Sequence, residues 1–559
     1  MTDTTRTRRA FLAGGMSAAV LLTAIASVTS LFVSPVDEQQ HQQHQRESRH
    51  ASIAAAQPAT TTDTNTTVVD PREMDAALGQ RIDSAINDSE FASAQWGIVV
   101  MSLRDGRTVY ERDADQLFTP ASNMKVYTTA VALDLLGADY RWRTSVYADA
   151  MPDADGTLAG DLVLYGRGAP DLASRSGKRR PTTHLAQLAA ALYERGVRRV
   201  RGGVIGDESY FRVEEVGDGW LWEDVQWYFG AAPSALSVDG NEVTVSIAPA
   251  AKVGEPVAVK VIPPTESVRV TSDARTAERG SRPSVGVERE LSSNEVRVWG
   301  DYPAGSEGYG VRLSVHQPAQ WAATLFRDAL RARGIVVEGG VRTRDWRTQA
   351  TEDFDPSRTI EMAAVLSRPL GEIVHDTNKE SLNLEAELLL RTLGKERGDV
   401  APVEDPERMR VRRDDEAGLA VVRRWLEEAG VRTRGMTLHD GSGLSRLNLV
   451  TPRATALLMR RMAERPPTVA KIFLDSLPIG GRDGTLEYRL RNAGAAGQRL
   501  TAKTGALIYV HALSGYATTA EGEVLVFSMI CNNETERAPG TRLIDTIASL
   551  LITYPTFNQ

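Results

Sequence analysis

Ser122 and Lys125 lie three residues apart at the start of segment 122–136, which the spacing of its apolar residues predicts to be a helix. This spacing puts the serine hydroxyl and the lysine amine on one helix face, where they can share a proton. A serine hydroxyl is a poor nucleophile until a base removes its proton, and lysine can do so when its pKa is lowered. Backbone N–H groups at the helix start would also stabilise an oxyanion. The pair predicts acyl transfer through Ser122, although a capped helix start with a surface lysine fits the same residues.

Lysine is scarce in this chain, which gives the position of Lys125 more weight. The 559 residues include eight lysines and 57 arginines, and Lys125 is the only lysine with a serine three residues before it. Arginine keeps its proton at physiological pH and cannot act as a base. A lysine at this position therefore indicates a role that arginine cannot take.

Ser381-Leu382-Asn383 offers a second hydroxyl and an amide at the start of an apolar helix predicted at 381–393. A hydroxyl near the lysine could relay a proton to a leaving amine, and the asparagine could hold both the lysine and a substrate amide. Taken alone, Ser381 fits equally well as the N-cap of this helix, with Glu385 in the first turn.

Lys503-Thr504-Gly505 lies in an alternating sequence that predicts a strand near 500–516. A cation and a hydroxyl on a strand can bind a substrate carboxylate, and glycine lets a ligand backbone lie against the strand edge. A peptide substrate could then add to the sheet as an extra strand. The alternative is an exposed strand with a kink.

In the order S-x-x-K, S-x-N, K-T-G, the three motifs resemble those of the serine acyl-enzymes that include penicillin-binding proteins and β-lactamases. Longer strings resemble the class C low-molecular-weight penicillin-binding proteins, the penicillin-binding protein 4 type of D-Ala-D-Ala carboxypeptidase and endopeptidase. These strings are PASNMK at 120–125, GDLVLYGRGAPDL at 160–172, GGVIGDESYF at 202–211, SALSVDGNEV at 234–243, NKESLNLEAELLLRTLG at 378–394, DGSGLSRLNLVTP at 440–452, LPIGGRDGTL at 477–486 and AKTG at 502–505. The long gap between Lys125 and Ser381 is also typical of this family, whose members carry two extra domains there.

The resemblance implies an α/β (α+β) catalytic domain of the serine β-lactamase and DD-peptidase type, split by two inserted mainly-β domains. It implies cleavage of the D-Ala-D-Ala bond of peptidoglycan stem peptides, or of D-Ala cross-links, through an acyl-enzyme, with β-lactams as inhibitors and no cofactor or metal. The residue roles it implies are Ser122 as nucleophile, Lys125 as base, Ser381 and Asn383 as the proton-relay and substrate-holding pair, and Lys503, Thr504 and Gly505 as substrate-binding residues.

Two positions depart from the family pattern. Ala506 follows Lys503-Thr504-Gly505 where the family often has a second hydroxyl, so we expect weaker or shifted carboxylate binding. Leu382 replaces a polar residue inside the S-x-N motif, but its side chain should point away from the face that bears Ser381 and Asn383.

The elements that must position these motifs occur at both ends of the chain. Strands are predicted at 92–103 and near 500–516 and 523–532, and further helices at 416–429, 451–464 and 540–553. We therefore expect one catalytic domain built from 73–141 and 357–559. The strand-rich stretch 142–356 between them, with helices predicted at 184–196 and 318–333, is expected to be the insertion. Within it, 142–172 and 245–356 are predicted to form one domain and 173–244 a second, nested domain.

The N-terminal residues have the pattern of an export signal. Residues 7–12 read T-R-R-A-F-L and precede an uncharged apolar stretch at 10–33, the layout of a twin-arginine signal; an ordinary export signal or a retained membrane anchor fits as well. Residues 34–72 are rich in Gln, His, Thr and Ala, and this composition predicts a disordered linker. The expected location is periplasmic or extracellular, with membrane contact only through this anchor.

Composition excludes several other classes of function. The net charge of -8 and the absence of a Lys/Arg block argue against nucleic-acid binding. Cys531 is the only cysteine, so the chain cannot form an internal disulfide or a cysteine-based metal site. The histidines are scattered and no H-E-x-x-H occurs, which argues against a zinc peptidase.

Two other segments carry chemistry-bearing residues. His439-Asp440-Gly441-Ser442 could suggest a Ser-His-Asp triad, but triad members converge from different chain segments, so we interpret this string as a turn lining the site. The Trp-rich segment 219–230 could stack on glycans, although packing within the insertion is the simpler interpretation.

Three functions fit these residues. The main hypothesis is a peptidoglycan DD-peptidase that acts through Ser122. A β-lactamase or esterase is disfavoured by the long insertion and by the lack of a deacylating glutamate motif. A catalytically weak protein that binds β-lactams or the cell wall is the alternative, which Ala506 supports.

Overall fold

The computed structural model describes residues 71–173, 183–214, 216–349, 354–399, 412–534 and 540–554. All of them belong to the unit Val69–Gln559. The predicted export signal lies outside the described residues, as does the predicted linker except for positions 71 and 72, which begin helix α2 (Pro71–Asn87). Within the described part of the chain, no helix is both long and apolar enough to cross a membrane.

A five-stranded antiparallel sheet joins the two ends of the chain, in the order β19-β20-β21-β1-β2. Its strands are β1 (Gln95–Ser102), β2 (Thr108–Arg112), β19 (Leu500–Leu507), β20 (Val510–Thr518) and β21 (Val524–Asn532). Strand β1 pairs with β21 from Gln95 opposite Asn532 to Ser102 opposite Leu525. The strands predicted from the two ends of the sequence therefore form one sheet.

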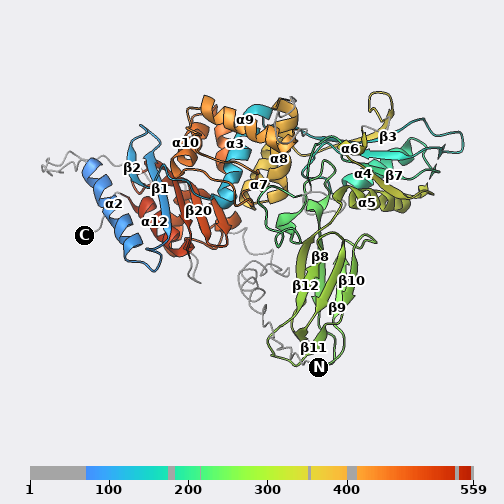
Figure 1. Ribbon diagram of the computed structural model, residues 1–559, viewed down its shortest axis with the longest axis horizontal. Helices are drawn as coiled ribbons and strands as arrows, with labels where there is room; N and C mark the ends of the chain where they lie inside the picture. The colour runs from blue at the N-terminus through green and yellow to red at the C-terminus, as the bar shows by residue number, and fades with distance from the viewer. Residues whose placement is uncertain are drawn as a thin grey trace, which may run out of the picture. The chain divides into compact units, whose positions relative to one another are not determined.

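Helices cover both faces of this sheet. Helix α2 and α12 (Thr541–Thr553) lie on one face, where Ile547 packs with Ile98 and Phe527 in a buried cluster (Figure 1). On the other face, α10 (Pro452–Ala463) contacts β1, β20 and β21. The remaining helices of this layer are α3 (Met124–Leu136), α7 (Leu370–Lys379), α8 (Asn383–Arg397), α9 (Asp414–Glu428) and α11 (Pro467–Ser476). This is the α/β catalytic architecture that the sequence predicts; helices α2, α7 and α11 were not predicted.

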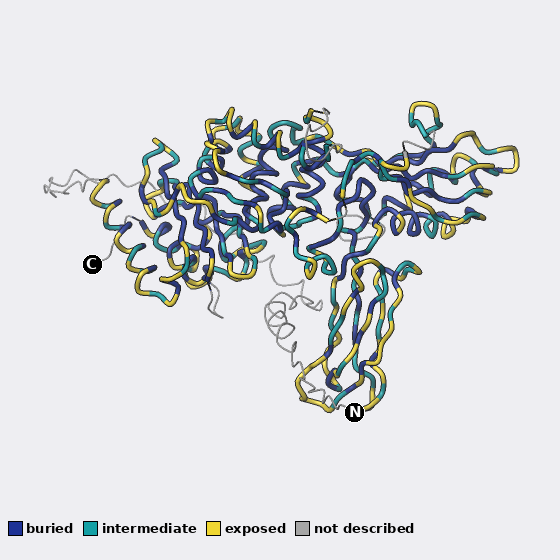
Figure 2. Tube along the Cα trace, viewed as in Figure 1, coloured by how far each residue is buried: buried dark blue, intermediate teal, exposed yellow. Residues whose placement is uncertain are grey.

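Helix α3 lies in the interior of the helical layer. Every residue from Met124 to Leu133 is buried, so this helix has no solvent-facing side over most of its length (Figure 2). A helix that is apolar on all sides is stable only inside a core. The surroundings of α3 therefore bury the Lys125 amine completely.

A second five-stranded sheet, in the order β17-β7-β5-β3-β18, contains four strands of the predicted insertion and β18, which lies beyond the end predicted at 356. Its strands are β3 (Arg143–Ala148), β5 (Leu162–Tyr165), β7 (Val204–Asp207), β17 (Val341–Arg344) and β18 (Ile360–Leu366). Helix α4 (His184–Glu194) contacts β18, and α5 (Pro318–Arg333) contacts α4, β7 and β17. Both helices lie close to the predicted ranges. Short strands β4 (Thr157–Leu158), β6 (Arg199–Val200) and β16 (Val336–Val337) form a small sheet of their own.

The rest of the insertion consists of short β-sheets between β7 and α5. Their strands are β8 (Glu242–Ala248), β9 (Ala258–Ile262), β10 (Arg269–Ser272), β11 (Arg275–Ala277), β12 (Gly286–Arg289), β13 (Glu295–Trp299), β14 (Asp301–Pro303) and β15 (Tyr309–Ser314). The pairings divide the insertion differently from the predicted boundaries. Strand β7 pairs with β5 across the boundary predicted at 172, and β15 pairs with β8, so the nested sheets span 242–314 rather than 173–244.

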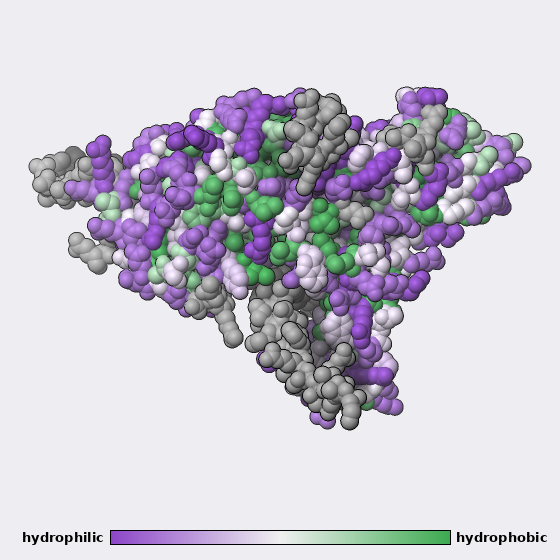
Figure 3. All heavy atoms as spheres, in the orientation of Figure 1, coloured by the Kyte–Doolittle hydropathy of each residue, from purple (hydrophilic) through white to green (hydrophobic). Residues whose placement is uncertain are grey.

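The surface is mixed in polarity. On the face shown in Figure 3, hydrophobic side chains occur in separate groups among hydrophilic ones and form no continuous band. Isolated exposed apolar residues are normal on soluble domains.

Candidate active site

Ser122 lies in a short 3-10 turn, Ala121–Asn123, which leads directly into α3. The preceding Ala121 has a φ of 47°, a left-handed conformation that non-glycine residues rarely adopt. Such strained backbone persists only where surrounding structure holds it, and it often occurs at functional sites. Here Gly443 packs so closely that a Cβ on it would lie 1.9 Å from the carbonyl oxygen of Ala121.

Lys125 contacts groups from three parts of the chain. Its Nζ lies 2.9 Å from Oγ of Ser122, as the helical spacing predicts. It donates to Oδ1 of Asn383 on α8 at 2.6 Å and to the carbonyl oxygen of Ser442 at 2.7 Å. The structure thus brings together the first motif and the asparagine of the second.

Burial lowers the pKa of Lys125 to about 7, while the negative charges of Asp440, Glu387 and Glu385 raise it. Desolvation disfavours the charged ammonium, and only partial compensation comes from carboxylates that do not contact it directly. A lysine with this pKa is half deprotonated near neutral pH. It can therefore accept the proton of the adjacent serine hydroxyl.

Ser381 contacts the third motif. Lys503 Nζ donates to Oγ of Ser381 at 2.9 Å and to the carbonyl oxygen of Thr504 at 3.0 Å. Ser381 has a φ of 58° and does not cap the helix, since Leu382 is the N-cap residue of α8 and makes no side-chain cap bond. The N-cap interpretation of Ser381 is therefore wrong. Its hydroxyl pairs with Lys503, whereas we predicted from the sequence that it would lie near Lys125.

The Lys503 ammonium is buried beside a second lysine. Burial first, and then the charge of Lys125, lower the pKa of Lys503 well below its usual value. A bound anion would offset both effects, because an opposite charge favours the protonated form. The site is therefore electrostatically suited to a substrate with a carboxylate next to Lys503.

Sequence reasoning missed a carboxylate beneath the site. Glu387 Oε1 accepts hydrogen bonds from the backbone N–H groups of Gly441 at 2.9 Å and Ser442 at 2.8 Å, and Oε2 pairs with Arg391 at 2.7 Å. This carboxylate holds the turn at Gly441 and Ser442 in place, and the carbonyl oxygen of Ser442 in turn contacts Lys125. In the sequence, Glu387 looks like any acidic residue of an amphipathic helix. The contact of a backbone carbonyl does not depend on residue type, so no sequence pattern indicates it.

The string His439-Asp440-Gly441-Ser442 lines the site as a turn, as interpreted from the sequence. Asp440 accepts hydrogen bonds from Asn448 Nδ2 at 2.6 Å and from the backbone N–H groups of Gly443 and Ser445. Its carboxylate therefore organises this turn and is not directed at a histidine.

The Trp-rich segment 219–230 reaches from the insertion to the catalytic motifs. Trp220 Nε1 donates to Asp440 at 3.0 Å, and Asn383 Nδ2 donates to the carbonyl oxygen of Phe229 at 2.8 Å. One N–H of the Asn383 amide is therefore occupied by protein. The segment forms a wall of the site, a role that sequence reasoning did not assign to it.

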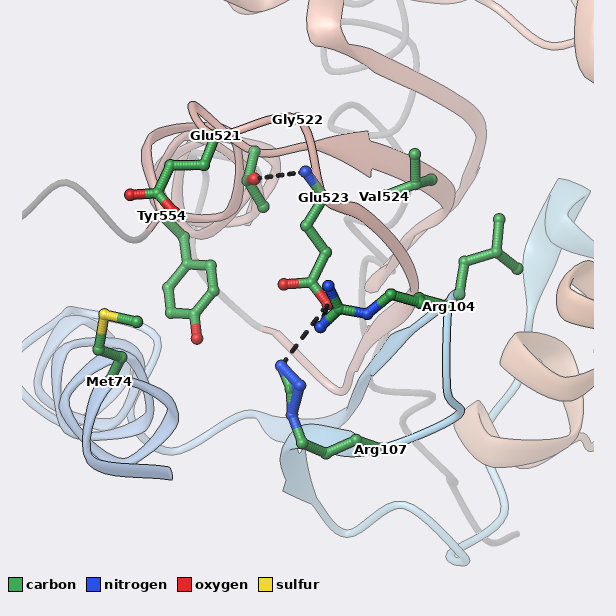
Figure 4. A pocket seen from close by; sticks show the side chains of 10 residues that line it. Met74, Arg104, Arg107, Glu521, Gly522, Glu523, Val524 and Tyr554 are labelled. Atoms are coloured by element: carbon green, nitrogen blue, oxygen red, sulfur yellow. Dashed lines mark hydrogen bonds and ion pairs between the residues drawn. The ribbon is translucent and has the colours of Figure 1, made fainter. Parts of the chain in front are cut away.

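A cavity of about 560 Å³ lies at the opposite end of the sheet from the turn that follows Lys503-Thr504-Gly505 (Figure 4). In it, Arg104 and Arg107 point toward Glu523, with ion-pair distances of 3.6 and 3.7 Å. Ser102 Oγ also donates to Glu523, and Tyr554 donates to Asp75. These polar groups satisfy one another, and no motif residue lines the cavity. It is not the candidate active site.

The structure brings S-x-x-K, S-x-N and K-T-G together at one site of an α/β fold. Sequence comparison gives the family. The chain matches the D-Ala-D-Ala carboxypeptidase 3 (S13) family over residues 78–554 and belongs to it.

Individual relatives agree with this assignment. The chain is 34% identical over 492 residues to a D-alanyl-D-alanine carboxypeptidase of Actinomadura sp. (strain R39), covering 85% of each chain. It is 25% identical over 456 residues to D-alanyl-D-alanine carboxypeptidase DacB of Haemophilus influenzae, covering 79% of this chain and 88% of that one. In fold, the structure is similar to penicillin binding protein 4 of Haemophilus influenzae, with a TM-score of 0.71, 24% identity, and coverage of 85% of this chain and 99% of the other. The resemblance read from the sequence is confirmed.

Proposed function

We propose that this serine D-Ala-D-Ala carboxypeptidase cleaves the terminal D-Ala-D-Ala bond of peptidoglycan stem peptides through an acyl-enzyme on Ser122. The observation that carries this proposal is the 2.9 Å contact between Ser122 and a buried lysine whose pKa is lowered to about 7. The chemistry fits the family to which the chain belongs. The same site would act on D-Ala cross-links as an endopeptidase and would be acylated by β-lactams, which a related solved structure binds.

In the proposed first step, Lys125 takes the proton of Ser122 while Oγ attacks the carbonyl carbon of the penultimate D-alanine. The oxyanion forms at the N-terminal end of α3, where the helix dipole favours negative charge. The C–N bond then breaks, and the proton that Lys125 took from Ser122 passes through the Ser381 hydroxyl, which Lys503 holds, to the leaving amine of the terminal D-alanine. Water hydrolyses the ester in the second step and restores Ser122. Lys503 and Thr504 bind the terminal carboxylate.

We further propose that the protein acts outside the cytoplasm, in the periplasm or extracellularly, because its substrate lies there. The apolar stretch at 10–33 would serve as an export signal or anchor, and 34–72 as a linker. A fusion of residues 1–72 to a reporter protein that is active only after export would show activity under this proposal. A reporter retained in the cytoplasm would contradict it.

The proposed function is tested by incubating the purified protein with a pentapeptide that ends in D-Ala-D-Ala and measuring released D-alanine. We expect release of one D-alanine per peptide, and no release of L-alanine from the same peptide ending in L-Ala-L-Ala. A folded protein that forms a stable β-lactam adduct but releases no D-alanine would favour the alternative, a β-lactam-binding protein with little turnover.

The rate of acylation should depend on pH through Lys125. Only the neutral amine can accept the Ser122 proton, so with a pKa of about 7 the rate of acylation by a β-lactam should rise about tenfold per pH unit below pH 6 and level off above about pH 8. Stopped-flow measurement of acylation between pH 5 and 10 checks this. A rate that is still rising tenfold per unit between pH 9 and 10 would indicate an unperturbed lysine.

Gly505→Ala should slow acylation because β19 lies directly against the turn that carries the nucleophile. A Cβ at this position would lie 2.7 Å from the carbonyl oxygen of Pro120 and 2.9 Å from Nδ2 of Asn123, so one of the two segments must move. Displacements of about 1 Å can cost roughly a hundredfold in rate. Gly340→Ala is the matched control, since a Cβ there meets nothing within 4 Å. Equal acylation rates in the two variants would show that this contact is not important.

A further inference from the structure

We propose that Thr485 is a substrate-binding residue whose hydroxyl supplies the second hydroxyl donor to the substrate carboxylate, in place of the one that Ala506 lacks. This inference rests on the proposed function, in which Lys503 and Thr504 bind that carboxylate. It starts from one contact: Oγ1 of Thr485 lies 2.7 Å from Oγ1 of Thr504.

The Thr485 hydroxyl lies beside the same threonine that a hydroxyl at position 506 would accompany. Side chains two residues apart on a strand point to the same face, so a hydroxyl at position 506 would lie beside that of Thr504. Ala506 offers only a methyl group there, and it is exposed. Thr485 comes from another segment, 477–486, and places its hydroxyl next to the same threonine. Both groups of the pair are accessible to a ligand, because Thr485 is exposed and Thr504 is partly so.

The segment that carries Thr485 is held firmly at the site. Asp483 Oδ1 accepts hydrogen bonds from Lys379 Nζ at 2.7 Å and from the backbone N–H of Ile479 at 2.8 Å. Gly484, with a φ of 54°, packs so closely on the chain that a Cβ would lie 2.6 Å from the carbonyl oxygen of Lys379. Leu486 is fully buried on the other side. These contacts tie Thr485 to the segment that leads into Ser381.

A hydroxyl pair of this kind suits a carboxylate. In the free protein one hydroxyl donates its hydrogen to the oxygen of the other. The hydrogen of the accepting hydroxyl has no partner within the pair. A carboxylate has two acceptor oxygens and no donor, so each hydroxyl can rotate to donate to one oxygen. Hydrogen bonds to charged groups are stronger than neutral ones, so loss of the Thr485 donor should weaken binding of an acid selectively.

The test compares Thr485→Val with wild type on two peptides that differ only in the terminal group, D-Ala-D-Ala as the free acid and as the amide. Valine keeps the shape of threonine and removes the hydroxyl. We expect kcat/KM for the acid to fall about tenfold or more, with little change for the amide, and Thr485→Ser to retain most activity. Thr546→Val on α12 is the matched control, because its hydroxyl bonds only to the backbone of Arg542.

Double variants separate direct binding from an effect through Thr504. If Thr485 binds the carboxylate itself, adding Thr485→Val to Thr504→Val lowers kcat/KM for the acid further, and Ala506→Thr restores activity to Thr485→Val. If the double variant equals Thr504→Val alone, or if Thr485→Val lowers acid and amide equally, the inference fails. In that case a loss of acid preference in Thr504→Val would still support the proposal that Lys503 and Thr504 bind the carboxylate. A wild-type enzyme that does not prefer the acid would contradict both.

Discussion

Lys125→Met should lower the rate of acylation by about a hundredfold to ten-thousandfold, because general-base catalysis contributes about 10²–10⁴ and no other described group contacts the Ser122 hydroxyl. Methionine fills a similar volume but cannot accept a proton. The variant should bind a β-lactam without forming the covalent adduct at a measurable rate. Acylation is followed with a fluorescent penicillin under single-turnover conditions.

Stability should not fall in parallel with this activity. Burial lowers the pKa of Lys125, so its charged form is disfavoured in the folded state, and an apolar replacement removes that cost. We expect the Tm of Lys125→Met to equal or exceed that of wild type, as replacement of functional buried polar groups often allows. Lys471→Met is the control, since this side chain is 74% exposed and pairs only with Asp475 in the structure. A fast-reacting Lys125→Met would contradict the base assignment.

Ser122→Ala should abolish D-alanine release, with kcat lowered by at least about 10⁴, since removal of a nucleophile leaves only binding and oxyanion stabilisation. Lys125 keeps its contacts with Asn383 and the carbonyl oxygen of Ser442, so the site should stay folded. Release of D-alanine is measured beside Ser549→Ala, whose hydroxyl bonds only to the backbone of Asp545. Turnover in Ser122→Ala within tenfold of wild type would require another nucleophile.

The sequence allowed prediction of the groups proposed to react, because their chemistry depends on residue type. Lysine can be a base and arginine cannot, so Lys125 could be proposed as the base before its surroundings were known. The helical spacing also predicted its contact with Ser122. The pairing of Ser381 with Lys503 could not be predicted, because it depends on how β19 lies against the segment before α8.

Groups that support the reacting residues were harder to find. Glu387 acts through two backbone N–H groups, and the carbonyl oxygen of Ser442 contacts Lys125, so neither interaction depends on a recognisable motif. Thr485 is one threonine in a Gly-rich loop, and only the fold places it beside Thr504. Glu387 is one of several polar residues near the motifs, and the sequence does not distinguish it from the others.

The fold of the catalytic domain was predicted well because its central strands β1 and β21 are short, almost uninterrupted apolar runs, and helices such as α10 and α12 have apolar residues at helical spacing. The limits of the nested domain were not, since they depend on non-local strand pairing. Strand β5 pairs in parallel with β7, with α4 in the connection between them, and β8 pairs with β15 at the far end of the nested sheets. Parallel pairing requires a long crossover, and nothing in the local sequence indicates which strand a given strand will meet.

The most direct test of the account is intact-mass analysis of the protein after incubation with penicillin, followed by peptide mapping. We expect a mass gain of one penicillin, located on Ser122, and no gain in Ser122→Ala. A folded wild-type protein without the adduct, or an adduct located on Ser381 or another residue, would contradict the central claim that Ser122 is the acylated nucleophile.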